Sequence, residues 1–294
     1  MSASTAGSTP HTPVPRTAAP ARPRPDVGPR ANGGPFGLLV LASWTELRSS
    51  ARSAEFAVGA VALPVLLYTM FGLPNVSRLD GGTTMRTAML VSLSSYGVIS
   101  LAIFTFGENI AKERGRGWTR ALRATPLPTS IYLLAKAVTA VAHAALIVVS
   151  VSLLAATAGG VDLPVGTWIA LGATMLAGVL AFSTLGFAIA LLARPRAATV
   201  ISNLIFLPLA FASGFFVPLS ELSPTMRGIA PWLPTFHFGQ LAYRIVMPAS
   251  DVEDLTGITP GLIGTHLAWV TAATIALGGL ALLAARREAV TRRG

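Results

Sequence analysis

Apolar residues dominate the chain from residue 56 onward and fall into six long runs, separated by short segments of polar or turn-forming residues. Each run is close to the ~20 residues that an α-helix needs to cross a lipid bilayer. The pattern predicts an all-α integral membrane protein with six transmembrane helices. The predicted spans are Phe56–Leu73, Thr87–Phe106, Ile131–Ala156, Thr167–Leu192, Ala198–Val217 and Leu262–Ala285.

The two ends of the chain have a different composition. Residues 1–35 are mainly Ser, Thr, Ala, Pro and Arg, with almost no large apolar side chains. Such a segment cannot bury enough apolar surface to fold. We therefore expect a disordered cytoplasmic tail over residues 1–35, a transmembrane domain over 36–285 and a basic cytoplasmic tail over 286–294.

The segment before the first span is amphipathic. Between Phe36 and Phe56, several Leu residues and Trp44 alternate with Glu46, Arg48 and Arg52. This pattern predicts an interfacial elbow helix that lies along the membrane surface. The alternative is a cytoplasmic extension of the first transmembrane helix.

Prolines interrupt the apolar region between the fifth and sixth spans. Pro224, Pro231 and Pro234 divide Leu219–Val246, so this segment cannot form one regular helix. We expect short re-entrant or external helices here. Any irregular backbone at membrane depth must then be buried in protein.

Basic residues are distributed unevenly around the predicted spans. The chain has 22 Lys and Arg, 12 Asp and Glu, and a net charge of +10. If the N-terminus is cytoplasmic, most of these cations lie in the tails and inner loops, as the positive-inside rule requires. This predicts a multi-pass protein of the cell membrane with both termini cytoplasmic. The clustering beside apolar runs also argues against binding of nucleic acid.

The sequence offers no internal source of energy for transport. A P-loop requires a Gly-Lys-Ser/Thr run, and neither Lys112 nor Lys136 follows a glycine. Ion-coupled carriers usually hold a carboxylate within the membrane, whereas the six predicted spans contain neither Asp nor Glu. An intramembrane protease is also disfavoured, because the spans lack paired Asp residues and the chain lacks a GxSxG elbow. We therefore expect a separate protein to supply the energy for transport.

Polar residues within the predicted spans are candidates for a translocation path or a dimer seam. Lys136, His143 and Ser150 are seven residues apart and so share one face of the third span. The alternative is that Lys136 extends to the membrane surface and His143 bonds a neighbouring helix. In the fifth span, Asn203 precedes Pro208, which marks either a hinge or a fixed kink.

The connection between the second and third spans has amphipathic character. Trp118, Ala121, Leu122 and Thr125 recur at helical spacing, with arginines on the other faces. The pattern predicts a short helix that docks into a groove of a soluble partner. The alternative is a basic loop that only fixes the topology.

Two segments carry a resemblance to a known family. The run from Glu113-Arg114 through Gly117-Trp118-Thr119-Arg120-Ala121-Leu122 to Pro126-Leu127 resembles the coupling-helix region of ABC-2 type permeases. The closest group is the daunorubicin-resistance type of actinobacterial drug exporters. Ser213-Gly214-Phe215-Phe216-Val217-Pro218 and Ala230-Pro231-Trp232-Leu233-Pro234 resemble that family's second signature. The chain departs from the pattern at Leu233-Pro234-Thr235, where drug exporters more often have an Asn-Pro pair.

The resemblance implies a non-catalytic permease subunit that works with a separate ABC ATPase and a second permease copy. ATP and Mg would bind to the partner, and this chain would hold no cofactor. The coupling contacts would be Glu113, Arg114, Trp118 and Leu122. The expected function is export of a hydrophobic or amphipathic, drug-like compound. The alternatives are a lipid or polysaccharide exporter and, in another class, an ion-coupled secondary carrier.

Overall fold

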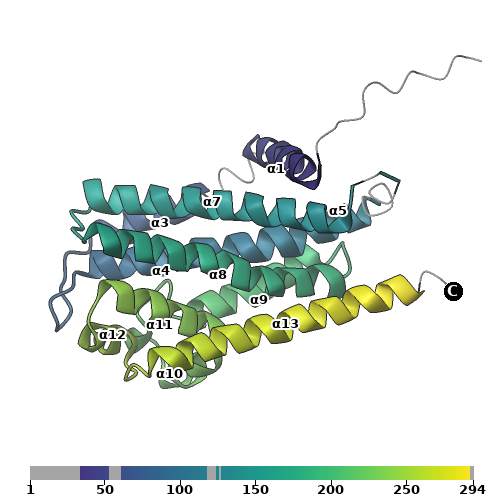
Figure 1. The fold of residues 1–294 in the computed structure, drawn as a ribbon. Helices are drawn as coiled ribbons and strands as arrows, with labels where there is room; N and C mark the ends of the chain where they lie inside the picture. The colour runs from purple at the N-terminus through teal and green to yellow at the C-terminus, as the bar shows by residue number, and fades with distance from the viewer. Residues whose placement is uncertain (1–33, 53–60, 118–123, 126, 292–294) are drawn as a thin grey trace, which may run out of the picture. The chain divides into compact units, whose positions relative to one another are not determined.

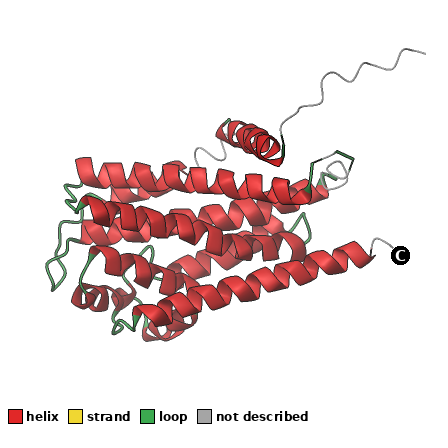
Figure 2. Ribbon diagram, in the orientation of Figure 1, coloured by secondary structure: helices red, strands yellow, loops and turns green. Residues whose placement is uncertain are grey.

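The structure is a computed structural model that describes residues 34–52, 61–117, 124–125 and 127–291, with side chains to residue 286. Within these ranges the chain is helical, apart from loops and one isolated bridge between Arg78 and Thr84 (Figure 2). Trp118 and Leu122, the predicted apolar coupling residues, lie outside the described residues, as does most of the predicted tail over residues 1–35.

Four described helices are long and apolar enough to cross a membrane. They are the continuous helix Met85–Gly115, α7 (Thr129–Thr157), α8 (Val165–Leu192) and the first 24 residues of α13 (Ile263–Thr291). Two shorter apolar helices correspond to the first and fifth predicted spans: residues Leu63–Gly72, composed of α3 (Leu63–Leu67) and η2 (Tyr68–Gly72), and α9 (Ala198–Ala212). The part of the chain that the structure describes is thus all-helical, with several helices able to cross a membrane.

α4 (Met85–Ala102) is the central helix of this unit. Every residue except Arg86 is buried, because α4 packs against α7, α8 and α11 (Pro234–Val246) (Figure 1). A helix that is apolar on all sides is expected to occupy such a position. Its buried serines suit close packing, and Ser92 shares a 2.6 Å hydrogen bond with the Tyr243 hydroxyl of α11.

The second predicted span is longer than the sequence indicates. Gly107 does not end the helix at Phe106. Instead, α4 continues through a π-helical segment, η3 (Ile103–Asn109), into α5 (Ile110–Gly115). Close packing against α8 explains the continuation: a Cβ on Gly186 would lie 2.6 Å from the Ala102 carbonyl and 2.8 Å from Phe106 Cβ. The two glycines let the helices approach closely.

Short helices follow α9, as the prolines predict. They are η4 (Leu219–Glu221), α10 (Pro224–Ile229), η5 (Ala230–Trp232), α11 and α12 (Ala249–Thr256). α10 and α11 each begin at a proline, where the missing N–H is tolerated. Pro208 lies inside α9, which ends one turn later at Ala212.

Polar contacts join the loops at the end where α10, α11 and α12 gather, opposite to α5 (Figure 1). The fully buried Asp251 of α12 accepts hydrogen bonds from the backbone N–H groups of Gly81 and Thr83. Arg86 donates to the carbonyls of Leu73, at 2.8 Å, and Gly159, at 3.0 Å. These contacts hold α12 against the loop that contains Gly81 and Thr83, and they hold Leu73 and Gly159 against the first turn of α4.

Candidate functional site

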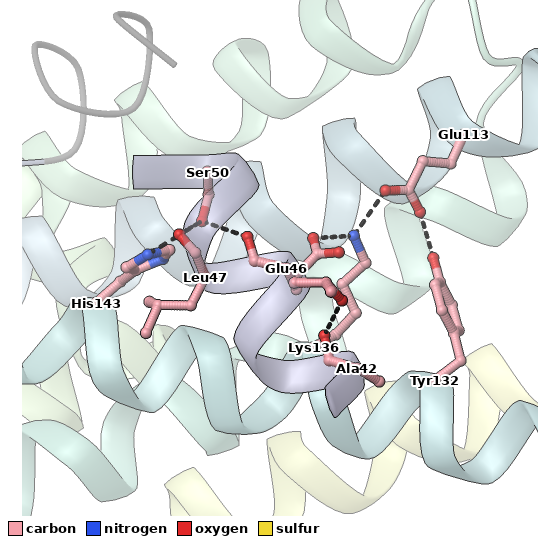
Figure 3. Close-up of polar contacts among 9 residues, drawn as sticks. Ala42, Glu46, Leu47, Ser50, Glu113, Tyr132, Lys136 and His143 are labelled. Carbon is pink, nitrogen blue, oxygen red and sulfur yellow. Dashed lines mark hydrogen bonds and ion pairs between the residues drawn. The ribbon is translucent and has the colours of Figure 1, made fainter. Parts of the chain in front are cut away.

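A buried lysine joins three helices at the α5 end of the unit. Lys136 lies in the second turn of α7, and its side chain is only 3% exposed. Its Nζ lies 2.5 Å from Glu46 Oε1 of α1 (Pro35–Ala51) and 2.6 Å from Glu113 Oε1 of α5 (Figure 3). The Tyr132 hydroxyl donates to the other oxygen of Glu113. We call these four residues the Lys136 cluster.

The electrostatics explain why a lysine is tolerated here. A buried ammonium is unfavourable unless it is paired and hydrogen-bonded. Two carboxylates surround Lys136, and its Nζ also lies 5.5 Å from the centre of the Tyr132 ring. The side chains of Glu46 and Glu113 are 35% and 27% exposed, so water still reaches the excess negative charge. The cluster is therefore satisfied without a further ligand.

A second polar contact strengthens the packing of α1 on α7. His143 is 3% exposed, and its Nε2 lies 3.2 Å from Ser50 Oγ (Figure 3). Ser50 follows Glu46 by one helical turn, and both face α7. Polar side chains on the predicted elbow helix therefore match polar side chains on the third span. Phe36, Val40, Leu41 and Trp44 of α1 remain exposed.

The helix that ends in α5 also reaches α8 and α9. Arg114 donates to the Ala190 carbonyl near the end of α8. Glu108 accepts a 2.8 Å hydrogen bond from Thr199 of α9 and pairs with Lys112 at 2.5 Å. Together with the Lys136 cluster, these contacts tie the η3–α5 segment to four other helices.

The structure brings some of the predicted residues together and separates others. Lys136, His143 and Glu113 belong to one polar region, and Arg114 is adjacent in sequence to Glu113. Ser150 is not part of it, because its hydroxyl donates to the Leu146 carbonyl of its own helix. Asn203 bonds the Thr199 carbonyl, and it and Pro208 lie on the exposed side of α9.

Sequence reasoning missed the partners of Lys136. Glu46 precedes it by 90 residues and Tyr132 by one helical turn. One signal was available: a lysine within an apolar run needs an acidic partner, and few carboxylates adjoin the apolar runs. The sequence also gave no indication that His237 of α11 and His266 of α13 meet, with 2.7 Å between their Nδ1 atoms.

The histidine pair has a defined hydrogen-bonding pattern. His237 Nε2 lies 2.9 Å from the Pro231 carbonyl, which can only accept, so this nitrogen carries a proton. In the neutral ring His237 Nδ1 is then the acceptor, and His266 Nδ1 donates to it. The His237 ring stacks on Trp269, with 5.1 Å between centroids. Burial lowers the pKa of His237, although the Pro231 hydrogen bond partly opposes this shift.

These features define a class of protein: a polytopic helical membrane protein in which the Lys136 cluster joins three helices at the α5 end. Comparison with known proteins gives the family. The model of the family described as "ABC-2 family transporter protein" matches residues 81–283. The match spans well over half of the chain, which therefore belongs to the ABC-2 transporter family.

A bacterial relative agrees with this assignment. Over 213 residues the chain is 28% identical to "Putative transport permease YvfS" of Bacillus subtilis (strain 168). The alignment covers 72% of this chain and 87% of the relative. The chain is thus an ABC transporter permease, a transport subunit rather than a catalytic enzyme, and its family normally works with an ABC ATPase.

Proposed function

We propose that this permease exports a hydrophobic or amphipathic, drug-like compound, using ATP that a separate nucleotide-binding subunit hydrolyses. The working unit contains two permeases and two ATPases. It lies in the cell membrane and holds ATP and Mg only in the ATPase subunits. This chain contributes the membrane path and the surface on which the ATPase docks.

One structural observation carries the proposal. The helix that begins at Met85 runs without interruption to Gly115, and there its charged residues bind α7, α8 and α9, while Lys136 of α7 in turn pairs with Glu46 of α1. The segment predicted to meet the ATPase includes Glu113 and Arg114 of this helix end and continues beyond it. A force on that segment is therefore applied to a helix end that is connected to four others. Such a connection suits a two-state transporter biased by nucleotide in its partner.

The resemblance to daunorubicin-resistance exporters supports a drug-like substrate, whereas Leu233-Pro234-Thr235 departs from their pattern. A lipid or polysaccharide exporter is the alternative within the same mechanism. An ion-coupled carrier is less well supported, because Glu108 and Glu113 gather near one end of their helix and are already bound by Thr199, Lys112 and Lys136.

We also propose six spans with both termini in the cytoplasm. Residues 61–72 and α9 provide the first and fifth spans, and α1 forms the interfacial elbow. Reporter fusions after Gly294 and within the loop at residues 159–164 should report opposite sides of the membrane. The same side for both fusions would overturn this topology.

Co-purification tests the dependence on a partner. The tagged permease should retain an ABC ATPase encoded beside it when both are expressed together. The purified permease without this subunit should release no phosphate from ATP. Sustained hydrolysis by the permease free of its partner would contradict the proposal.

A further inference from the structure

An apolar groove separates part of α1 from α7. It has a volume of about 360 Å³, and its walls include Leu39, Trp44 and Leu47 of α1 together with Val138 and Ala142 of α7. No charged side chain lines it. Its volume lies at the lower end of the range for small-molecule pockets. Because α1 exposes apolar side chains beside the groove, a membrane would supply hydrocarbon to its mouth.

Two residues of the groove wall carry buried hydroxyl groups that have no hydrogen-bond partner among the described residues. They are Ser43 Oγ of α1 and Thr139 Oγ1 of α7. Thr139 is only 3% exposed. Other hydroxyls on α1 behave differently: Thr45 and Ser50 each bond carbonyls of their own helix. Buried polar groups are normally satisfied, so two unpaired hydroxyls beside one groove are available to a guest that accepts hydrogen bonds.

We propose that the groove binds one ester-linked acyl chain of a bilayer phospholipid. The ester carbonyl accepts hydrogen bonds from Ser43 and Thr139, because a carbonyl oxygen has two lone pairs. The chain occupies the apolar part of the groove. The neutral lining excludes the phosphate and any free carboxylate, whose charge would lie in an apolar cavity without a cation. The phosphate group stays at the membrane surface.

The position of this site relates it to the Lys136 cluster. Ser43 precedes Glu46 by three residues, and Thr139 follows Lys136 by three residues. Both pairs are about one helical turn apart, so the hydroxyls and the ion pair belong to the same contact between α1 and α7. A bound lipid therefore stabilises the packing of α1 on the helix that carries Lys136.

Trp44 provides a fluorescent reporter at the groove. The full-length permease is prepared with Trp118, Trp168, Trp232 and Trp269 replaced by phenylalanine, and is placed in bilayers of stated composition. The bilayers contain a phospholipid whose chains carry bromine, a quencher of tryptophan fluorescence, at one depth. Two versions are compared: the diester lipid and the diether lipid, which has the same chains but no carbonyl. This comparison requires no substitution in the groove.

The ester lipid should quench Trp44 at an about two- to tenfold lower mole fraction than the ether lipid, as expected for hydrogen bonds of ordinary strength. The variant Ser43→Ala/Thr139→Val should lose this difference. Thr45→Val is the matched control, since its hydroxyl already bonds the carbonyls of Leu41 and Ala42, and it should keep the difference. A variant in which Trp232 is the sole tryptophan should show no difference in quenching between the ester and the ether lipid.

Two results would overturn the proposal. Equal quenching by ester and ether lipids in the groove-intact protein would show that Trp44 contacts only bulk lipid. A preference that persists in Ser43→Ala/Thr139→Val would show that these hydroxyls do not bind the ester. Neither result depends on the ATPase or on export, so the lipid site and the proposed transport function are tested separately.

Discussion

Lys136 Nζ of α7 lies 2.6 Å from Glu113 Oε1, at the last turn of the long helix that begins at Met85. This contact joins the third predicted span to the helix end in which the proposed ATPase-binding segment begins. Glu46 of α1 approaches the same ammonium from the other side. The ion pairs therefore place one cation at the junction of three helices.

Removing the charge of Lys136 should destabilise the protein. In Lys136→Met, Glu46 and Glu113 face each other without a cation, and we expect a loss of about 1–3 kcal/mol, reduced from the fully buried case because both carboxylates are partly exposed. Thermal unfolding in detergent measures the effect. The triple variant Lys136→Met/Glu46→Gln/Glu113→Gln should recover most of the loss.

Lys112→Met is the control for this prediction. Lys112 is 39% exposed and pairs with Glu108 within one helix. Its loss should cost no more than about 0.5 kcal/mol. If Lys136→Met unfolds at the same temperature as Lys112→Met, the Lys136 cluster does not hold α1, α5 and α7 together.

The close approach of α8 to η3 should depend on Gly186. A Cβ added there lies 2.6 Å from the Ala102 carbonyl, so Gly186→Ala must push the helices apart and should cost about 1–3 kcal/mol. Gly172→Ala on the same helix has open space and should be neutral or slightly stabilising. Comparable unfolding temperatures for the two variants would show that the π-helical segment is not held by this packing.

Acid should weaken the packing of α11 on α13. Burial lowers the pKa of His237 below its unfolded value of about 6.5, so the unfolded chain binds the proton more tightly. The stability that neutral His237 provides is complete above that unfolded pKa and falls as the pH drops through it towards the lower folded pKa. Unfolding temperatures across this range should fall with pH, and less steeply in His237→Phe. An identical slope in that variant would exclude His237 as a source of the pH dependence.

The fold class could be predicted from the sequence, but the limits of particular helices could not. The apolar runs predicted six spans, and the described residues contain four helices that are long and apolar enough to cross a membrane. The predicted second span ends at Phe106, yet the helix continues through Gly107, because packing against Gly186 and the contacts of Glu108 and Arg114 outweigh the low helix propensity of one glycine. Tertiary contacts of this kind leave no local signal.

The candidate site was likewise predictable from the sequence only in part. Lys136 and His143 were identified as unusual because polar side chains are rare in apolar runs. Their partners come from α1, about ninety residues earlier, and spacing along one helix cannot reveal such a contact. Glu113 was predicted to contact the ATPase. In the structure it binds Lys136 and Tyr132 within the chain, so a change at Glu113 would affect stability as well as coupling.

Trp118 therefore offers the cleaner test of coupling. It lies outside the six predicted spans, so Trp118→Ala should insert normally, whereas loss of an apolar anchor from a small docked interface should weaken ATPase binding or separate hydrolysis from export. Export and ATPase stimulation are measured at matched membrane levels, with Glu113→Ala beside it. If both variants export as the unmodified protein does, residues 108–127 have only a topological role.

The source of energy is the central claim, and transport into inside-out membrane vesicles tests it most directly. Uptake of a fluorescent amphiphile is measured with the permease and its ATPase together, with the permease alone, and with an ATPase that cannot hydrolyse ATP. We predict ATP-dependent uptake only when the permease is combined with an active ATPase, and no effect of collapsing the proton and sodium gradients. Uptake by the permease alone that follows an ion gradient would contradict the account and identify a secondary carrier.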